Sequence, residues 1–400
     1  MSLWKYSLRA FYARLVLCAV VLFPAVFPAG AAAKTAGGPV LAAHARSAVL
    51  MDATTGMVLF EKNEHERLPI ASVTKVATML VVFDALDRGQ VRLTDAVRTS
   101  DYAASMGGSQ IYLQAGEQMT LRDMLKGVAM SSANDAAVAV AEHLAGSEAN
   151  FVRLMNGRSH ALGLRDTHFV NTNGLPAANH YSSAYDVAVL SRALLEHHGV
   201  TEFTGAYSDH LRKHSDKPFW LVNTNKLVRF FQGMDGIKTG YTAEAKFCLA
   251  ASAKRQNFRV IAVVLGEPTA SIRNAEVTEM MNYAYSQYDI KPVYKRGQTV
   301  MLAPVMRGQL QAVAVTASRP VGLLVNKMDQ SVTGRVVTDL RPLVAPVKKG
   351  QFAGVIKIVD GDKVLSTIPV IVAADIGQAS MLEMLGRSLR SLFLFGVSTG

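Results

Sequence analysis

Cysteine is nearly absent from this sequence, which contains only Cys18 and Cys248. A fold held together by several disulfides is therefore excluded, and cohesion must come from an apolar core. Half of the 400 residues are hydrophobic, which is enough to supply such a core, and the length predicts two or three domains. Cys248 lies in an apolar strand pattern, so we expect a buried, unreactive thiol.

Two kinds of functional motif are also lacking. No His-Glu-x-x-His helix or cysteine–histidine cluster is present, so we expect neither a metal nor another cofactor. The formal net charge of +11 would suit nucleic acid, an anionic membrane or an acidic polymer. Since no basic segment is interleaved with aromatic residues, we expect no nucleic-acid partner.

The apolar run near the N-terminus, at 15–27, is too short for a membrane-spanning helix, which needs about 20 residues. It follows Lys5, Arg9 and Arg14 and ends in small residues, which is typical of a secretory signal peptide. We therefore predict a signal peptide over 1–33 and an exported mature protein. Its cleavage would remove Cys18 and leave a single thiol.

Hydrophobic patterning predicts an α+β fold. Alternating runs predict strands at 47–60, 247–252 and 259–265. Apolar residues at helical spacing predict helices at 70–86, 120–130, 135–144, 184–195 and 274–288. This order indicates an antiparallel sheet with helices packed on it. After Lys291, short Val-rich runs broken by Gly, Pro and Asp predict a small β domain.

The segment 381–395 has an amphipathic helical pattern, with charged residues opposite an apolar face. The apolar face contains Leu382, Leu385, Leu389, Leu392 and Phe393. An ordinary surface helix packed on the β domain would also fit. The terminal position and the basic residues opposite the apolar face favour a helix that lies in a membrane interface.

A serine and a lysine begin the helical pattern at 70–86, in the order Ser72-Val73-Thr74-Lys75. Three residues apart on a helix, Ser72 and Lys75 emerge on the same face. A lysine can then act as base if burial and neighbouring positive charge keep it neutral. Chance supplies a Ser-x-x-Lys pattern about once or twice in about 400 residues. Taken alone, therefore, the pair indicates nothing beyond structure.

Two further motifs follow in order: Ser-Ala-Asn at 132–134, in a break between helices, and Lys-Thr-Gly at 238–240, entering a strand. Singly, the first would be interpreted as a helix cap and the second as a turn. Together with the serine–lysine pair they suggest a serine acyl-transferase site, in which a second serine relays a proton and an asparagine holds a substrate amide.

With these three motifs the chain resembles the low-molecular-mass penicillin-binding proteins, D-alanyl-D-alanine carboxypeptidases of the serine-peptidase kind. The resemblance extends from about residue 43 to the C-terminal helix and includes Asn-Gly-Leu at 173–175 and the run at 235–242. It implies a penicillin-binding/β-lactamase-like antiparallel sheet with helices on both faces. A small β-sandwich domain and the amphipathic helix would follow. The implied organisation is a signal peptide (1–33), a catalytic domain (34–290), a β domain (291–375) and a membrane-anchoring helix (376–400).

The resemblance also implies the roles of individual residues. Catalysis would use Ser72 as nucleophile, Lys75 as base and Ser132 as proton relay. The substrate would be held by Asn134, Lys238, Thr239, Gly240, Tyr241 and Arg273. The backbone N–H groups of Ser72 and Tyr241 would form the oxyanion hole, and Arg273 would hold the substrate's terminal carboxylate. Without the resemblance, Arg273 would be interpreted as a surface arginine at a helix start.

The implied reaction removes the terminal D-alanine from peptidoglycan pentapeptide stems through an acyl-enzyme on Ser72, at the outer face of the bacterial cytoplasmic membrane. β-Lactam antibiotics would acylate the same serine. Three alternatives remain. A class A β-lactamase would have an aspartate where Ala133 stands. A D,D-endopeptidase would share every motif, and a non-catalytic wall-binding protein would not need to retain all three. The chain departs from the family at Lys246, where a small residue is usual.

Overall fold

The protein is described here by a computed structural model, which covers residues 40–387 except 214 and 216. The signal peptide predicted over 1–33 lies outside the described residues. So does the part of the predicted terminal helix that follows residue 387.

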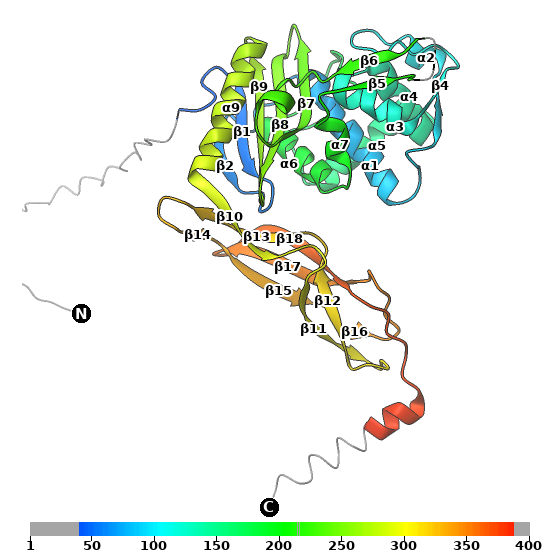
Figure 1. The fold of residues 1–400 in the computed structure, drawn as a ribbon, viewed down its shortest axis with the longest axis vertical. Helices are drawn as coiled ribbons and strands as arrows, with labels where there is room; N and C mark the ends of the chain where they lie inside the picture. The colour runs from blue at the N-terminus through cyan, green and yellow to red at the C-terminus, as the bar shows by residue number, and fades with distance from the viewer. Residues whose placement is uncertain (1–39, 214, 216, 388–400) are drawn as a thin grey trace, which may run out of the picture. The chain divides into compact units, whose positions relative to one another are not determined.

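A five-stranded antiparallel sheet is the centre of the fold, with strand order β2-β1-β9-β8-β7 (Figure 1). The strands are β1 (Ser47–Asp52), β2 (Val58–Lys62), β7 (Met234–Thr242), β8 (Lys246–Arg255) and β9 (Phe258–Glu267). The predicted hairpin at the N-terminal end forms around Gly56, whose positive φ of 79° suits glycine. The longer strands β8 and β9 include the predicted runs at 247–252 and 259–265.

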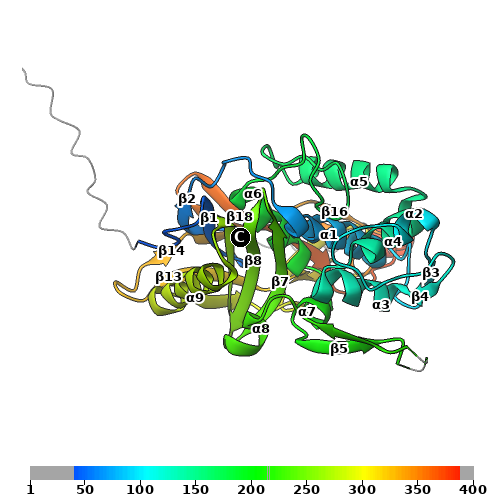
Figure 2. The same ribbon diagram turned by 90° about the horizontal axis from the view of Figure 1, so that it is seen from above.

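Residues alternate between two cores along the strands of this sheet. Val49 and Ala250 pack in one core with α1 and α6, whereas Leu50 and Leu249 pack in the other with α9 (Figures 1 and 2). Successive side chains on a strand point to opposite faces of the sheet, which produces this division. The predicted arrangement, with helices on both faces of an antiparallel sheet, is therefore confirmed.

The helices lie mostly between β2 and β7 in the chain. They are α1 (Lys75–Asp87), α2 (Asp101–Ala104), α3 (Leu121–Lys126), α4 (Asn134–Ala145), α5 (Glu148–Ala161), α6 (Ala184–Leu195), α7 (Val200–Thr204), α8 (Leu227–Phe230) and α9 (Ala270–Gln287). A 3-10 turn, η1 (Ala71–Thr74), precedes α1, and a π-helical turn, η2 (Gly127–Ser131), follows α3. Two short hairpins accompany them, β3 (Ala96–Arg98) with β4 (Gln118–Thr120) and β5 (Ser208–Leu211) with β6 (Phe219–Val222).

The boundaries of α9 differ from the prediction of 274–288. The helix begins at Ala270 because the Thr269 hydroxyl accepts a hydrogen bond from the Ile272 N–H and caps the first turn. It ends at Gln287, and Tyr288 already belongs to a strand. The predicted helix at 120–130 also changes, because its second half forms the π-helical turn instead of a regular α-helix.

The C-terminal part of the described chain is β-rich, as predicted, and has an apolar core of its own. A three-stranded sheet contains β10 (Tyr288–Tyr294), β13 (Val321–Asn326) and β14 (Val332–Thr333). A six-stranded sheet contains β15 (Arg335–Leu340), β17 (Phe352–Asp360), β18 (Lys363–Val372), β12 (Ala312–Ala317), β11 (Thr299–Met306) and β16 (Leu343–Val344). Strand pairing starts at Tyr288, three residues before the change of composition at Lys291.

A terminal helix is present at 381–387. The Ser380 hydroxyl and the Glu383 carboxylate exchange hydrogen bonds with each other's backbone N–H groups, which forms a capping box. Met381, Leu382 and Leu385 are exposed, by 84%, 82% and 61%. Within the described residues, no helix combines the length and apolar character that crossing a membrane requires.

Candidate active site

The pair Ser72 and Lys75 lies where the sheet meets the helices. Ser72 belongs to the 3-10 turn η1, and Lys75 is the first residue of α1. Ala71, just before the serine, has a φ of 47°, a left-handed conformation that is costly for a residue with a side chain. A Cβ on Gly174 would stand 1.9 Å from the Ala71 carbonyl oxygen, so only glycine allows this loop to support the turn.

Three polar groups surround the Lys75 amine, which is completely buried. Its Nζ lies 3.0 Å from Ser72 Oγ, 2.7 Å from Asn134 Oδ1 and 2.7 Å from the Asn173 carbonyl oxygen. A neutral amine has two hydrogens and one lone pair. The two carbonyl oxygens can accept both hydrogens, which turns the lone pair toward the Ser72 hydroxyl. The arrangement therefore suits removal of the serine proton.

The electrostatic surroundings favour this neutral form. Burial lowers the pKa of Lys75 well below its usual value, and the nearby positive charge of Lys238 lowers it further. The carboxylate of Asp135 opposes this shift in part. Because the desolvation effect is the largest, the free amine is accessible without a separate general base.

The second motif occupies the junction between η2 and α4. Ser132 is buried and has a left-handed φ of 66°, which ends the π-helical turn. The residue at the N-cap of α4 is Ala133, and no side chain caps this helix. Interpretation of the motif as a helix cap is therefore wrong. The junction instead places Asn134 in contact with Lys75, two residues after the buried Ser132.

The side chain of Asn134 is held on both of its ends. Its Oδ1 accepts from Lys75, and its Nδ2 donates to the Gly107 carbonyl oxygen at 2.7 Å. Its backbone N–H donates to the Ser109 carbonyl oxygen, also at 2.7 Å. The buried Asp135 carboxylate next to it accepts from the backbone N–H groups of a loop that follows Ser109. The second motif is therefore held in place by the loop at 107–113, which contains none of the three motifs.

The third motif lies inside β7 rather than in a turn. A Cβ on Gly240 would stand 2.6 Å from the Ile70 carbonyl oxygen and 3.1 Å from the Val73 N–H nitrogen. Glycine therefore allows β7 to approach the turn that carries the nucleophile. Thr239 donates its hydroxyl to Thr224 Oγ1 at 2.7 Å.

Two cations lie buried near one another at this end of the site. Lys238 has a pKa of about 7, lowered by burial and by the charge of Arg273. Arg273 is only 6% exposed, so it is not the surface arginine that its helix-start position would suggest. Its guanidinium donates to Asn274 Oδ1, and it forms no ion pair with a carboxylate of the described chain. These two buried cations, partly balanced through space by the Glu267 carboxylate, suit an anionic ligand group.

Tyr241 and Lys246 border the end of β7. The Tyr241 ring is 57% exposed and packs on Phe247, with centroids 4.4 Å apart. Lys246 begins β8 in a left-handed conformation, with φ 56°, and pairs with Thr242. The unusual lysine at this position therefore falls in a turn that a small residue would adopt more easily, and its side chain is exposed.

Sequence reasoning did not assign roles to two residues that contact this site. The Asn173 carbonyl accepts from Lys75, and the Thr224 hydroxyl accepts from Thr239. An Asn-Gly pair at 173–174 signals a turn, but a backbone acceptor carries no side-chain signature. Nothing in the sequence around Thr224 marks it. Cys248, as predicted, is a buried thiol, and burial raises its pKa to about 11.

Similarity to known proteins covers both parts of the described chain. Residues 32–269 match the family described as D-alanyl-D-alanine carboxypeptidase. Residues 288–378 match the family described as the C-terminal domain of penicillin-binding protein 5.

Individual relatives are similar over most of their length. The D-alanyl-D-alanine carboxypeptidase DacF of Bacillus subtilis is 48% identical, over 87% of this chain and 90% of its own. DacD of Escherichia coli, also a D-alanyl-D-alanine carboxypeptidase, is 33% identical over 86% of this chain and 89% of its own. Among solved structures, penicillin-binding protein 5 of Haemophilus influenzae is 30% identical, covers 85% of this chain and 99% of its own, and superposes with a TM-score of 0.65.

Proposed function

The chain belongs to the D-alanyl-D-alanine carboxypeptidase family, and from this premise we propose that Ser72 is the nucleophile that releases the terminal D-alanine of peptidoglycan pentapeptide stems. The observation that carries the proposal is the position of the Lys75 amine. It is buried, its pKa is lowered, and it lies 3.0 Å from Ser72 Oγ.

The first half of the reaction forms an acyl-enzyme. Lys75 takes the proton of the Ser72 hydroxyl while Oγ bonds to the carbonyl carbon between the two terminal D-alanines. Backbone N–H groups of Ser72 and Tyr241 stabilise the oxyanion. The C–N bond then breaks, and the leaving amine receives the proton from Lys75 through the Ser132 hydroxyl.

The second half regenerates the enzyme. Water attacks the ester on Ser72, its proton passes to Lys75, and Ser72 Oγ leaves with a proton returned from the lysine. Asn134 holds the substrate amide, while Lys238, Thr239 and Arg273 hold the terminal carboxylate. The positive charge of Lys238 and Arg273 supports this assignment, since a peptide with a free carboxylate is the complementary ligand. Gly240 lets β7 come close enough for these contacts.

Labelling with a fluorescent penicillin tests the nucleophile. We expect the wild-type protein to be modified covalently and the Ser72→Ala variant to remain unlabelled. Ser131→Ala is the matched control, because that serine lies one residue before the second motif and donates only to the Gly127 carbonyl oxygen. Labelling of Ser72→Ala would remove Ser72 from the role.

Defined muropeptides test the bond that is cut. Release of free D-alanine from a pentapeptide, without cleavage of cross-linked dimers, supports a carboxypeptidase. Cleavage of the dimers would instead make the protein a D,D-endopeptidase. A folded wild-type protein that does neither, and that takes up no penicillin, would be a non-catalytic binding protein.

We also propose that the protein is exported and acts at the outer face of the cytoplasmic membrane. The predicted boundaries are a signal peptide over 1–33, a catalytic domain over 34–290, a β domain over 291–375 and an anchor over 376–400. The exposed apolar residues Met381, Leu382 and Leu385 support the anchor. Removal of 381–400 should release the protein from sedimenting membranes, as should Leu382→Glu with Leu385→Glu in the full chain. Unchanged sedimentation of both variants would exclude the anchor.

A further inference from the structure

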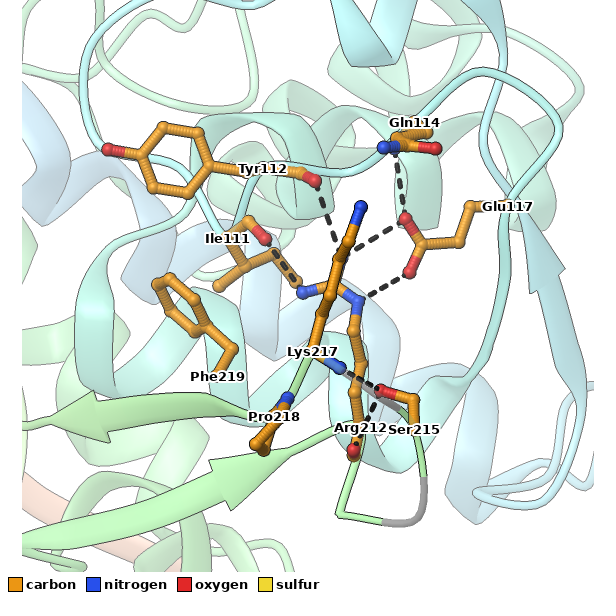
Figure 3. A pocket seen from close by; sticks show the side chains of 9 residues that line it. All are labelled: Ile111, Tyr112, Gln114, Glu117, Arg212, Ser215, Lys217, Pro218 and Phe219. Carbon is orange, nitrogen blue, oxygen red and sulfur yellow. Dashed lines mark hydrogen bonds and ion pairs between the residues drawn. The ribbon is translucent and has the colours of Figure 1, made fainter.

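A hydrogen-bonded clamp joins the β5–β6 hairpin to the loop that fixes the second motif. Arg212, just after β5, donates from Nε to Glu117 Oε1 at 2.7 Å and from Nη2 to Oε2 at 3.0 Å. Its Nη1 donates to the Ile111 carbonyl oxygen at 3.0 Å (Figure 3). A bidentate arginine–carboxylate pair with a third hydrogen bond to the backbone fixes the orientation of the loop relative to the hairpin and the distance between them.

The backbone on both sides of the clamp is held in costly conformations. Arg212 has a φ of 52°, and Tyr112, next to Ile111, has a φ of 54°. Residues with side chains keep such conformations only where the surrounding contacts enforce them. The clamp lines a cavity of about 510 Å³, with Tyr112 and Phe219 on one side of it (Figure 3). This part of the loop is therefore held by the clamp on its outer side and by the buried side chains of Ile111 and Leu113 on its inner side.

A continuous series of hydrogen bonds leads from the clamp toward the second motif. Ile111, whose carbonyl binds Arg212, donates its N–H to Asp135 Oδ2 at 3.1 Å, and the Leu113 N–H donates to the same oxygen at 3.0 Å. Asp135 directly follows Asn134 at the start of α4. The loop that carries Ile111 therefore holds the first turn of this helix.

The same loop also binds Asn134 directly, four and two residues before Ile111. The Gly107 carbonyl accepts from Asn134 Nδ2, and the Ser109 carbonyl accepts from its backbone N–H, both at 2.7 Å. Asn134 Oδ1 in turn accepts from Lys75 Nζ at 2.7 Å. The position of the lysine amine is thus connected by hydrogen bonds to a hairpin that lies outside all three motifs.

We propose that Arg212, through its clamp on Glu117 and Ile111, is a positioning residue for Asn134 and Lys75. The inference rests on the proposed function of this site. Without the clamp, the Ile111 carbonyl and the half-buried Glu117 carboxylate lose their partner and must attract water. The loop then no longer holds Asn134 in a single position, and water reaches the Lys75 amine. The other charged groups that act on this amine are Lys238 and Asp135.

The same hairpin provides a matched control. Asp209, within β5, forms ion pairs with Lys126 at 2.9 Å and with Lys213 at 2.8 Å. Lys126 belongs to α3, so these contacts do not reach the loop that binds Asn134. Asp209→Asn therefore removes charged contacts from this hairpin but leaves the clamp intact. Arg212→Gln and the milder Glu117→Gln weaken the clamp itself.

The test measures acylation by penicillin between pH 5 and pH 10 for the full-length wild type and the three variants. We expect Arg212→Gln to slow acylation at pH 7 about tenfold, because the reacting groups are no longer held in place. In the profile of acylation rate against pH, the acidic limb of this variant should move to higher pH by at least about half a unit. The reason is that a hydrated lysine amine gains a proton more readily. Glu117→Gln should change the acylation rate and the position of the acidic limb in the same directions but by less. Asp209→Asn should change neither of these two quantities.

Two results would overturn the proposal. One is an Arg212→Gln profile that matches Asp209→Asn in both rate and pH dependence. The other is a lower rate with an unshifted acidic limb in both clamp variants, which would indicate a general loss of structure. Thermal denaturation shows whether each variant is folded. If Arg212→Gln does not fold, the rate and pH profile of Glu117→Gln decide the proposal. A wild type that takes up no penicillin would instead refute the proposed function.

Discussion

Replacement of Asn134 by aspartate tests whether Lys75 acts as a neutral base. The variant keeps the size of the side chain but places a carboxylate where Oδ1 lies 2.7 Å from Lys75 Nζ. Coulomb's law with an effective dielectric constant of about 20 gives an attraction of about 4 kcal/mol even at about 4 Å. That energy stabilises the ammonium and raises the pKa of Lys75, so the neutral amine becomes up to about a thousandfold rarer at pH 7.

Acylation by penicillin should therefore slow by up to about a thousandfold at pH 7 and recover at alkaline pH. Asn134→Ala is the control, because it removes the same acceptor without adding charge. It should lower the rate and move the acidic limb of the pH–rate profile far less than the aspartate does. Pre-steady-state labelling from pH 6 to pH 11 measures both. If Asn134→Asp and Asn134→Ala share one pH profile, the protonation state of Lys75 does not control the reaction.

Three further predictions concern other parts of the structure. Arg273→Leu should raise KM about tenfold or more for a peptide ending in a free carboxylate, and steady-state kinetics on the matching C-terminal amide should show no such rise. Burial beside another carboxylate raises the pKa of Glu267 to about 8, so the folded protein loses stability as pH rises from about 4.5 to 8. Glu267→Gln should therefore gain stability relative to wild type as pH rises across that window, as measured by urea unfolding; a constant difference between pH 4 and pH 9 would contradict this. Gly174→Ala should destabilise the protein by about 3 kcal/mol or more and slow acylation, because its Cβ would collide with the Ala71 carbonyl. Gly163→Ala has a similar positive φ with nothing near its Cβ, so equal losses in thermal denaturation would show that the collision is unimportant.

Local patterns in the sequence were sufficient for much of the fold. Alternation of period two predicted four of the five strands of the central sheet, all but β7, and helical spacing gave the bounds of α6 without error. Both signals arise because a side chain's direction depends only on its neighbours along the chain. The boundary of α9 was wrong because the cap at Thr269 precedes the apolar pattern that signalled the helix.

The sequence by itself determined which chemistry is available. Ser72 and Lys75 share a face because they are three residues apart, and the later motifs follow in the order that the family requires. Whether the lysine could act as base was decided only by tertiary structure. Its pKa depends on burial, on Lys238 and on Asp135, and acceptors contributed by Asn134 and Asn173, far away in the chain, orient its amine. Desolvation and charge act through space, so no local pattern records them.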